Sequence, residues 1–380
     1  MNILVATTDN LEEHTAGANF VLSISLALSD IGHKVSLLHP DAPDSILRRN
    51  ERYSAIESIP VIWIPVRGWA RVFPYFFAAK FNSLVKDDQR RFDWVLLRVV
   101  PTRSTLVAIE NCRIPMATIH FEAYFSRPEV RKAAKNIALF IHNYKPEYIR
   151  GKAAQINVPT ERFLHIYYNA VAPEAFSVTA APSEIRVRYG LDRNSLILVH
   201  VSSFRCHHDF DTLLEAASMV KCRYQIVFVG TGSREEEIRS KAVANRINAR
   251  FLGNRSLSEV AELLTAADLC VDPLMPFYVS DDNLRPAKLW EYLASGRPVI
   301  ESIDVNLPVA DWAHEHLSLV PAGDAAALAA AITDIQCHQE YWSEKAARAR
   351  QWVFANHTWK QVAEEIIAAF DQPSRVKVEA

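Results

Sequence analysis

Cysteine is scarce in this sequence and shows no pairing pattern. The 380 residues contain five cysteines, an odd number, and no two of them form a C-x-x-C pair. Because a disulfide framework and a zinc knuckle both need characteristically spaced cysteines, neither is expected. This usage is typical of a reducing compartment, so we expect a cytoplasmic protein.

An excess of one charge and long apolar runs are also missing. The 42 basic and 44 acidic residues nearly cancel, so the overall charge gives no reason to expect nucleic acid as a partner. No apolar run approaches the roughly 20 residues of a membrane-spanning helix. The first residues, MNILVATTDN, lack the basic start and the long apolar run of a signal peptide.

What is present is the composition of a globular protein with a hydrophobic core, 49% hydrophobic and 23% charged. Short apolar runs alternate with helix-like stretches. Ile3–Ala6 and Val35–Leu38 read as strands that flank a helix closed by Gly32, which makes a βαβ unit with parallel strands. Further candidate strands continue this sheet to about residue 170: Val61–Val66, Trp94–Val100, Met116–His120, Ile137–Ile141 and Phe163–Tyr167.

The second half repeats this pattern. Strand Leu196–Val201, a helix over Phe210–Val220 and strand Gln225–Val229 form another βαβ unit, and Ser177–Glu184 reads as a linker between the halves. The length suits two domains. We therefore expect an α/β protein with two Rossmann-like domains, each a doubly wound parallel sheet.

The segment DDNLRPAKLWEYLASGRPVI, Asp281–Ile300, predicts a loop, a short helix and a strand. Pro286 suits a first helical turn and Gly296 suits a helix C-terminus. The helix start offers unpaired N–H groups and roughly half a positive charge to an anion, and Glu291 one turn later can hold hydroxyls. Phosphate beside sugar hydroxyls describes a nucleotide sugar. The alternative is an ordinary helix with a solvated Glu291.

Other polar residues follow predicted strands, where open α/β sheets bind ligands. His120 ends one strand and precedes Glu122. The loop SSFRCHHDF brings Ser203, Arg205 and His208 before a helix and suits phosphate, unless its basic residues are incidental. The adjacent Cys206, His207 and His208 do not predict a metal site, because neighbouring side chains diverge.

The segment GWARVFPYFFAAKF, Gly68–Phe81, combines aromatic and basic residues. One interpretation is a core helix kinked at Pro74. The other is a surface for the acceptor or for the membrane interface, where such amphipathic segments lie.

The sequence PAKLWEYLASGRPVI resembles the donor-binding segment of the retaining GT-B glycosyltransferases of the GT4 type, P-x-K-x-x-E-x-x-A-x-G-x-P-V. Further similarity lies in the GHKV phrase at Gly32, in the interdomain phrase ending at Phe176, in the SFRCHH loop and in the V-G-x-G turn at Gly230 and Gly232. It spans nearly the whole chain. Asn283 stands where these enzymes often carry a glutamate near the transferred sugar.

The resemblance implies a GT-B fold with an acceptor domain at residues 1–172, a nucleotide-sugar domain at 173–350 and a segment, 351–380, that crosses back to the first domain. It implies that His120 faces the transferred sugar. The lysine usual in the loop after residue 201 is absent, so its cationic role passes to Arg205 or His208. Predicted catalytic residues are His120, Arg205 and Lys288, and predicted donor-binding residues are Gly17, Ser203, His208, Gly230, Gly232, Asn254, Asn283, Leu284, Arg285, Pro286, Ala287 and Glu291.

The expected reaction moves a sugar from a UDP-, GDP- or ADP-linked donor to a glycan or lipid-linked acceptor, with retention of configuration. No cofactor and no metal are expected, since no Asp-x-Asp motif has suitable surroundings, and a peripheral contact with the inner membrane face is an option. Two alternatives remain open, a GT-B-fold nucleotide-sugar epimerase and a non-catalytic nucleotide-sugar-binding protein.

Overall fold

The structure, a computed structural model, forms two compact units. The first contains Met1–Tyr168 and Trp359–Ala380, and the second contains Asn169–Thr358. The described residues are 1–9, 11, 16–40, 59–64, 73–85, 91–142, 146–166, 169–276, 287–306 and 309–372.

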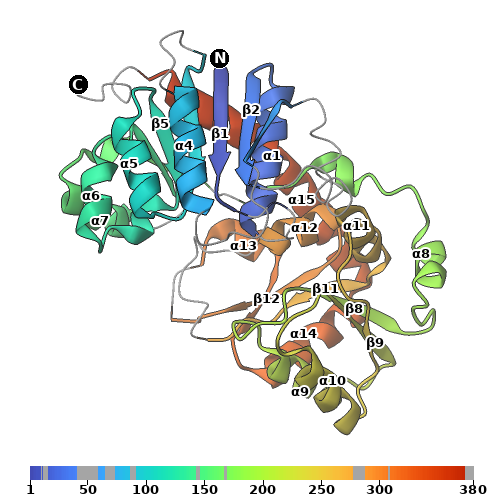
Figure 1. The fold of residues 1–380 in the computed structure, drawn as a ribbon. Helices are drawn as coiled ribbons and strands as arrows, with labels where there is room; N and C mark the ends of the chain where they lie inside the picture. Colours follow the sequence, from blue (N-terminus) through green and yellow to red (C-terminus); the bar gives the residue numbers. More distant parts are fainter. Residues whose placement is uncertain are drawn as a thin grey trace. The chain divides into compact units, whose positions relative to one another are not determined.

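The first unit is built on a seven-stranded parallel sheet in the order β3-β2-β1-β4-β5-β6-β7 (Figure 1). Strand β1, the third in this order, is largely a run of buried aliphatic residues, as expected where helices cover both faces of a parallel sheet. The strands are Asn2–Thr7 (β1), Lys34–Pro40 (β2), Val61–Ile64 (β3), Trp94–Arg98 (β4), Met116–Ile119 (β5), Leu139–His142 (β6) and Phe163–His165 (β7).

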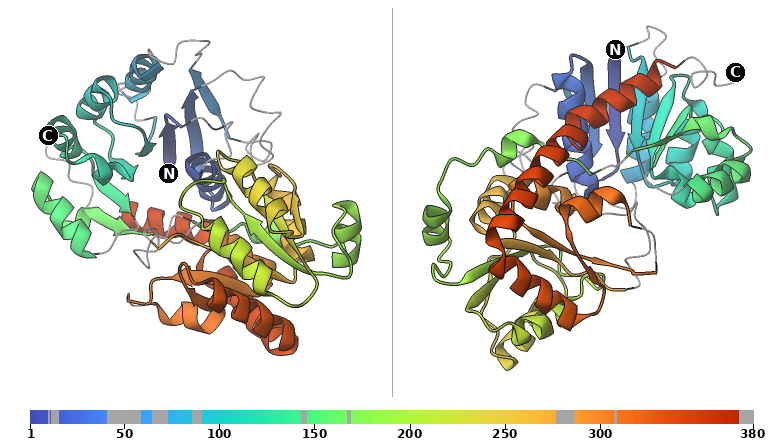
Figure 2. Two further views of the ribbon diagram at one scale, coloured as in Figure 1. Left: turned by 90° about the horizontal axis from the view of Figure 1, so that it is seen from below. Right: turned by 180° about the vertical axis from the view of Figure 1, so that it is seen from behind.

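Two sets of helices cover this sheet. Leu4 packs in one core with Phe77 and Leu106 from α4 and α5, whereas Trp94 stacks on Phe370 of α16, with ring centroids 4.0 Å apart. Helix α16 also packs on α1 and crosses the strands in the right-hand view of Figure 2. The helices are Ala16–Asp30 (α1), Phe73–Val85 (α4), Arg103–Asn111 (α5), Phe121–Tyr124 (η1, a 3₁₀ turn), Pro128–Ala134 (α6), Pro146–Ile156 (α7), Thr160–Arg162 (η2) and Trp359–Phe370 (α16).

The second unit is built on a six-stranded parallel sheet in the order β10-β9-β8-β11-β12-β13. Its strands are Leu196–Val201 (β8), Tyr224–Val229 (β9), Ala249–Phe251 (β10), Leu269–Asp272 (β11), Val299–Ile303 (β12) and Ser318–Pro321 (β13). Its helices are Pro173–Phe176 (η3), Pro182–Arg188 (α8), Phe210–Met219 (α9), Glu235–Ala244 (α10), Leu257–Ala266 (α11), Ala287–Ser295 (α12), Asp311–His316 (α13), Ala325–Cys337 (α14) and Gln339–Asn356 (α15).

These sheets confirm the predicted α/β fold of two parallel, doubly wound sheets. Two local expectations change. Pro74 is the second residue of α4, so it begins that helix instead of kinking it. The predicted linker ends in helix α8, which is anchored because Arg186 binds Asp268 at 2.8 Å.

The C-terminal segment divides between the units. Helix α15 lies wholly in the second unit, and α16 alone belongs to the first. In the described part of the chain, no helix is long and apolar enough to cross a membrane.

An aromatic cluster lies beneath helix α12 in the second unit. Trp290 stacks on His357, with ring centroids 4.1 Å apart, and also packs beside Trp312 and Trp352. Because Trp290 is 1% exposed, the cluster fixes the buried face of α12 against α13 and α15.

Candidate functional site

Each sheet has one position where its strand order changes direction. It lies between β1 and β4 in the first unit and between β8 and β11 in the second. Open α/β sheets bind ligands at the carboxyl ends of the strands at such positions. Charged residues occur at both positions.

In the second unit, a buried ion pair occupies this position. The ammonium of Lys288, at the start of α12, lies 2.5 Å from Oδ1 of Asp272, the last residue of β11. It also lies 3.1 Å from Nδ1 of His208. All three side chains are less than a tenth exposed, so the loop after β8, the end of β11 and the start of α12 are held together by one charged group.

The ammonium determines the state of His208. An ammonium only donates hydrogen bonds, so Nδ1 of His208 is an acceptor and its proton lies on Nε2. Burial and the charge of Lys288 hold the pKa of His208 far below its ordinary value. A neutral His208 supplies no positive charge to this loop. Arg205 is exposed, and its predicted cationic role toward the donor stays a prediction.

Lys288 itself is committed to its partners. Burial lowers its pKa, whereas the nearby carboxylates of Asp272 and Glu301 oppose that effect. The prediction that Lys288 stabilises a diphosphate stays a prediction, because in this structure its ammonium pairs with Asp272.

A second contact anchors α12 to β8. The backbone N–H of Val201 donates to the hydroxyl oxygen of Tyr292, 2.7 Å away. Helix α12 ends at Ser295, and the next residue, Gly296, has a φ of +70°, the left-handed conformation expected just after a helix C-terminus. Glu291 is half-buried on this helix. Ala287 is its first residue, and the predicted donor-binding residues Asn283, Leu284, Arg285 and Pro286 lie outside the described residues.

The turn after β9 approaches the loop after β8 closely. A Cβ on Gly230 would lie 1.9 Å from the carbonyl oxygen of Ser202, and one on Gly232 would lie 2.6 Å from the backbone nitrogen of Phe204. The N–H of Phe204 donates to the carbonyl of Thr231 at 3.1 Å. Both glycines are therefore required by this approach, and Gly230 also has a φ of +121°.

Exposed polar groups surround these two loops. Ser203 and Asn254 are exposed, and the Thr231 hydroxyl donates to the side-chain oxygen of Asn254 at 3.1 Å. The loops after β8, β9 and β10 thus present hydroxyl, amide and guanidinium groups at one edge of the sheet, which suits phosphate and hydroxyl ligands.

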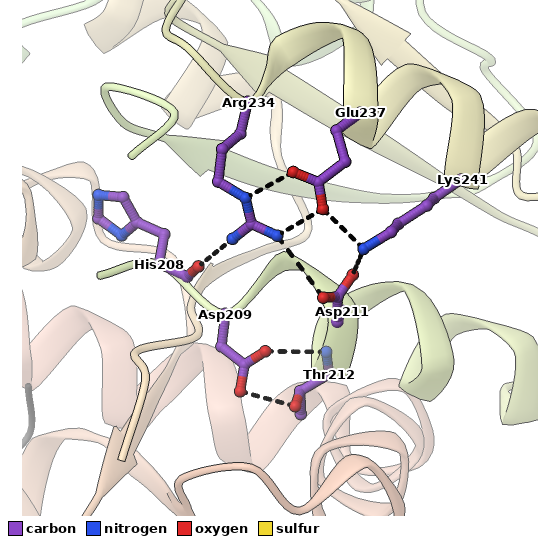
Figure 3. Close-up of polar contacts among 7 residues, drawn as sticks. All are labelled: His208, Asp209, Asp211, Thr212, Arg234, Glu237 and Lys241. Carbon is purple, nitrogen blue, oxygen red and sulfur yellow. Dashed lines mark hydrogen bonds and ion pairs between the residues drawn. The ribbon is translucent and has the colours of Figure 1, made fainter. Parts of the chain in front are cut away.

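Arg234 ties this edge to helices α9 and α10, as Figure 3 shows. Its guanidinium donates to the backbone carbonyl of His208 at 3.3 Å and to Glu237 at 2.8 Å. Arg234 and Lys241 together lower the pKa of Glu237 to about 2, and Lys241 bridges to Asp211 at 2.7 Å. This network therefore fixes the backbone at His208 through the hydrogen bond from Arg234.

In the first unit, an ion pair spans the ends of β1 and β4. Nε of Arg98 lies 2.5 Å from Oδ2 of Asp9, and both side chains are 25% exposed. A Cβ on Gly17 would lie 2.6 Å from Nη2 of Arg98. Gly17 therefore makes room for the ion pair at the start of α1; its predicted contact with the donor stays a prediction.

His120 follows β5 at the same edge of that sheet. Its φ of +58° is unusual for a residue other than glycine. Its Nδ1 lies 3.9 Å from Oε1 of Glu122, which is fully buried. Burial, and less strongly the charge of Arg98, lower the pKa of His120 to about 4, so its imidazole is neutral at pH 7.

Several of these residues were not predicted as site residues from the sequence. Asp272, Arg98, Asp9 and Tyr292 acquire their roles through contacts between distant segments. A usable signal did exist for Asp272 and Arg98, because each is a charged residue that ends an apolar strand, LCVD and WVLLR. Among the described residues, no group of three potential metal ligands comes together.

Comparison with known proteins gives a family match for one segment of the chain and structural matches for nearly its whole length. Residues 195–337 match the family model of the group 1 glycosyl transferases. Solved structures similar to the chain include Anabaena HepE in complex with UDP-glucose, at 15% identity and a TM-score of 0.71, covering 97% of this chain and 100% of that one. A glycosyltransferase from Rickettsia africae is 14% identical, with a TM-score of 0.71, and the match covers 97% of this chain and 97% of that one. Sucrose-phosphate synthase from Thermosynechococcus elongatus is 15% identical, with a TM-score of 0.69, and the match covers 97% of this chain and 98% of that one.

No curated protein matches the sequence. At such identities the structural likeness shows the fold alone. The family match covers the part of the second unit that contains Lys288, Asp272 and His208. The resemblance inferred from the motifs is confirmed: the chain has the GT-B fold, and residues 195–337 match the group 1 glycosyl transferases.

Proposed function

We propose that the protein is a glycosyltransferase that takes its sugar from a nucleotide-diphosphate sugar. One observation carries this proposal. The segment that matches the group 1 glycosyl transferases contains Lys288, Asp272 and His208, which meet at the carboxyl ends of the neighbouring strands β8 and β11. A donor bound there meets exposed Arg205 and the N-terminal end of α12, and both favour a diphosphate.

The stabilisation of the diphosphate would be mainly electrostatic. Groups fixed before the reaction stabilise the charge that develops on the leaving nucleotide, which is usually the largest catalytic contribution. Arg205 and the amides at the start of α12 are assigned this role, and Glu291 is assigned the ribose hydroxyls. A hydrogen bond to a charged group contributes about 1.5–3 kcal/mol.

A UDP-linked sugar is the favoured donor. HepE has been solved with UDP and with UDP-glucose, and TarM of S. aureus has been solved with UDP. We also propose retention of configuration and no metal or other cofactor, on the resemblance of the donor segment to retaining enzymes. The second unit would bind the donor and the first unit the acceptor.

The acceptor is proposed to be a glycan or a lipid-linked glycan. Helix α4 of the first unit exposes Tyr75 and Phe76, 71% and 49% exposed, beside the exposed Lys80. Aromatic rings next to a basic side chain suit a membrane surface. This supports peripheral contact with the cytoplasmic face of the membrane.

Thermal-shift measurements with UDP-, GDP- and ADP-sugars test the donor proposal. A ligand at one hundred times its Kd should stabilise the protein by about 2.7 kcal/mol, and we expect this response with a UDP-sugar. No response to any of the three would contradict the proposal. Incubation with donor alone then separates the alternatives, because an epimerase yields an epimer, and a binding protein neither hydrolyses nor transfers the sugar.

A further inference from the structure

The turn after β5 contains two unfavourable features within three residues. His120 adopts a left-handed backbone conformation with φ +58° and ψ +20°, which is strained for a residue other than glycine. Glu122 is fully buried, and neither carboxyl oxygen has a hydrogen-bond partner among the described residues. Strained backbone and buried polar groups without hydrogen bonds are found mainly at functional sites.

The two side chains face each other. Nδ1 of His120 and Oε1 of Glu122 are 3.9 Å apart, and the His120 side chain is 34% exposed while that of Glu122 is inaccessible. A hydrogen bond needs about 2.6–3.2 Å, and such contacts are often longer before a ligand binds. A side-chain movement of about 1 Å would therefore connect the buried carboxyl group to the accessible ring.

The charged groups around the pair influence its protons unequally. Burial raises the pKa of Glu122 to about 7, against the weaker opposing effects of its own backbone N–H and of the Lys152 ammonium on α7. Burial and Arg98, at the end of β4, lower the pKa of His120 to about 4. Near neutral pH the imidazole therefore stays neutral, and the group that titrates is the carboxyl.

We propose that Glu122 is a positioning residue that selects the tautomer of His120. As a carboxylic acid, Glu122 donates to Nδ1, so the ring proton lies on Nε2. As a carboxylate, Glu122 accepts from the Nδ1–H, so Nε2 becomes an acceptor. The proton that the acid loses goes to solvent, and the neutral ring moves its own proton from Nε2 to Nδ1.

This inference rests on the proposed function in one respect, the assignment of His120 to the transferred sugar. The tautomer decides what Nε2 can do there. With its proton, Nε2 donates a hydrogen bond to a sugar hydroxyl oxygen; without it, Nε2 accepts one from the hydroxyl. Glu122 would thus set the polarity of a contact that it does not make itself.

Selective ¹³C,¹⁵N-histidine labelling in the deuterated 380-residue protein tests this directly. The ring shifts report the tautomer of each of the 13 histidines, and a His120→Gln variant identifies the His120 signals. From pH 6 to 8.5, we expect the wild-type ring to change from the Nε2–H form to the Nδ1–H form. In Glu122→Gln, which keeps the size of the side chain but cannot titrate, the tautomer ratio should stay constant.

A matched control is Glu129→Gln. Glu129 lies seven residues further along, its side chain is 52% exposed and it pairs with Arg127 at 2.8 Å, so this variant should keep the wild-type change. A wild-type ratio that stays constant, or a change that persists in Glu122→Gln, would overturn the proposal.

The NMR experiment needs neither donor nor acceptor, so its failure is distinguishable from failure of the transferase proposal. Once an acceptor is found, the ratio of kcat in wild type to kcat in Glu122→Gln should vary at least threefold from pH 6 to 8.5. A ratio that is independent of pH would mean that Glu122 acts only through the local fold, and would count against the proposal.

Discussion

The ammonium of Lys288 and the carboxylate of Asp272 form an ion pair of 2.5 Å between α12 and the end of β11, with side-chain exposures of 9% and 0%. A buried pair of this kind contributes little compared with an apolar pair of the same shape, but removal of one partner leaves an isolated buried charge. The stability of the second unit therefore depends on neither charge being left without the other.

Lys288→Met should lower the free energy of unfolding by about 3–5 kcal/mol, because Asp272 then lacks its counter-ion. The double variant Lys288→Met/Asp272→Leu removes both charges and should recover most of that loss. Urea denaturation followed by circular dichroism measures both effects. A double variant as unstable as the single one would show that the side chains are needed for their shape and not for their charge balance.

Gly230→Ala should destabilise the protein by at least about 2 kcal/mol, because its Cβ would meet the Ser202 carbonyl and its φ is positive. The matched control is Gly151→Ala on helix α7, where a Cβ would meet nothing within 4 Å. That change should stabilise by up to about 1 kcal/mol through helix propensity. Equal midpoints of thermal unfolding for the two variants would contradict this account of the β9 turn.

Glu291→Ala should lower donor affinity or kcat/KM at least about tenfold, since a charged acceptor of hydrogen bonds is lost. Glu364→Ala is the control, because its side chain is 53% exposed on α16 and pairs only at 3.9 Å with Lys360. Isothermal titration with the donor found by thermal shift gives the comparison. Unchanged affinity and unchanged turnover in Glu291→Ala would remove this residue from the site.

Acid should destabilise the protein partly through His357. Burial lowers its pKa to about 4 from an ordinary 6.5, so the unfolded chain binds this proton more readily than the folded one. Stability should therefore fall as the pH decreases from about 6.5 to 4. His357→Phe keeps a ring to stack on Trp290, and its unfolding free energy should depend less steeply on pH, by up to one proton or about 1.4 kcal/mol per pH unit. Identical slopes in the two proteins would refute the assignment to His357.

Transfer activity should persist in millimolar EDTA, as expected of a site in which fixed protein groups stabilise the diphosphate. The initial rate with and without chelator is the measurement. A loss of more than tenfold that added Mg²⁺ or Mn²⁺ restores would show that a divalent cation takes part.

Periodicity and apolar runs predict the sheets well. The apolar run Leu196–Val201 predicts a strand, and β8 has these limits. Sequence rules for helices are less informative at a proline, because a proline can either begin a helix or kink it. Pro74 suggested a kink, but whether a proline starts or bends a helix depends on the residues before it, and those do not carry a strong start signal.

The site was predictable only in part. The strand-to-turn motif at Gly230 and Gly232 predicts donor-binding residues; the structure shows that both glycines allow the close approach of the Ser202 and Phe204 backbone, and their contact with the donor stays a prediction. The pairing of Lys288 with Asp272 and the neutral state of His208 could not be predicted, because both depend on which side chains the β8–β11 junction brings together. The sequence also placed Glu122 beside His120 but gave no indication that its carboxyl group is buried.

The last helix of the first unit has a consequence for synthesis on the ribosome. Trp94 and Phe20 pack against Phe370 and Trp359 of α16, residues that are made only after the entire second unit. The part of the first sheet that α16 covers must therefore emerge exposed while nearly two hundred further residues are translated, and its final packing step follows the synthesis of the second unit. Chaperone demand should accordingly centre on the nascent first unit.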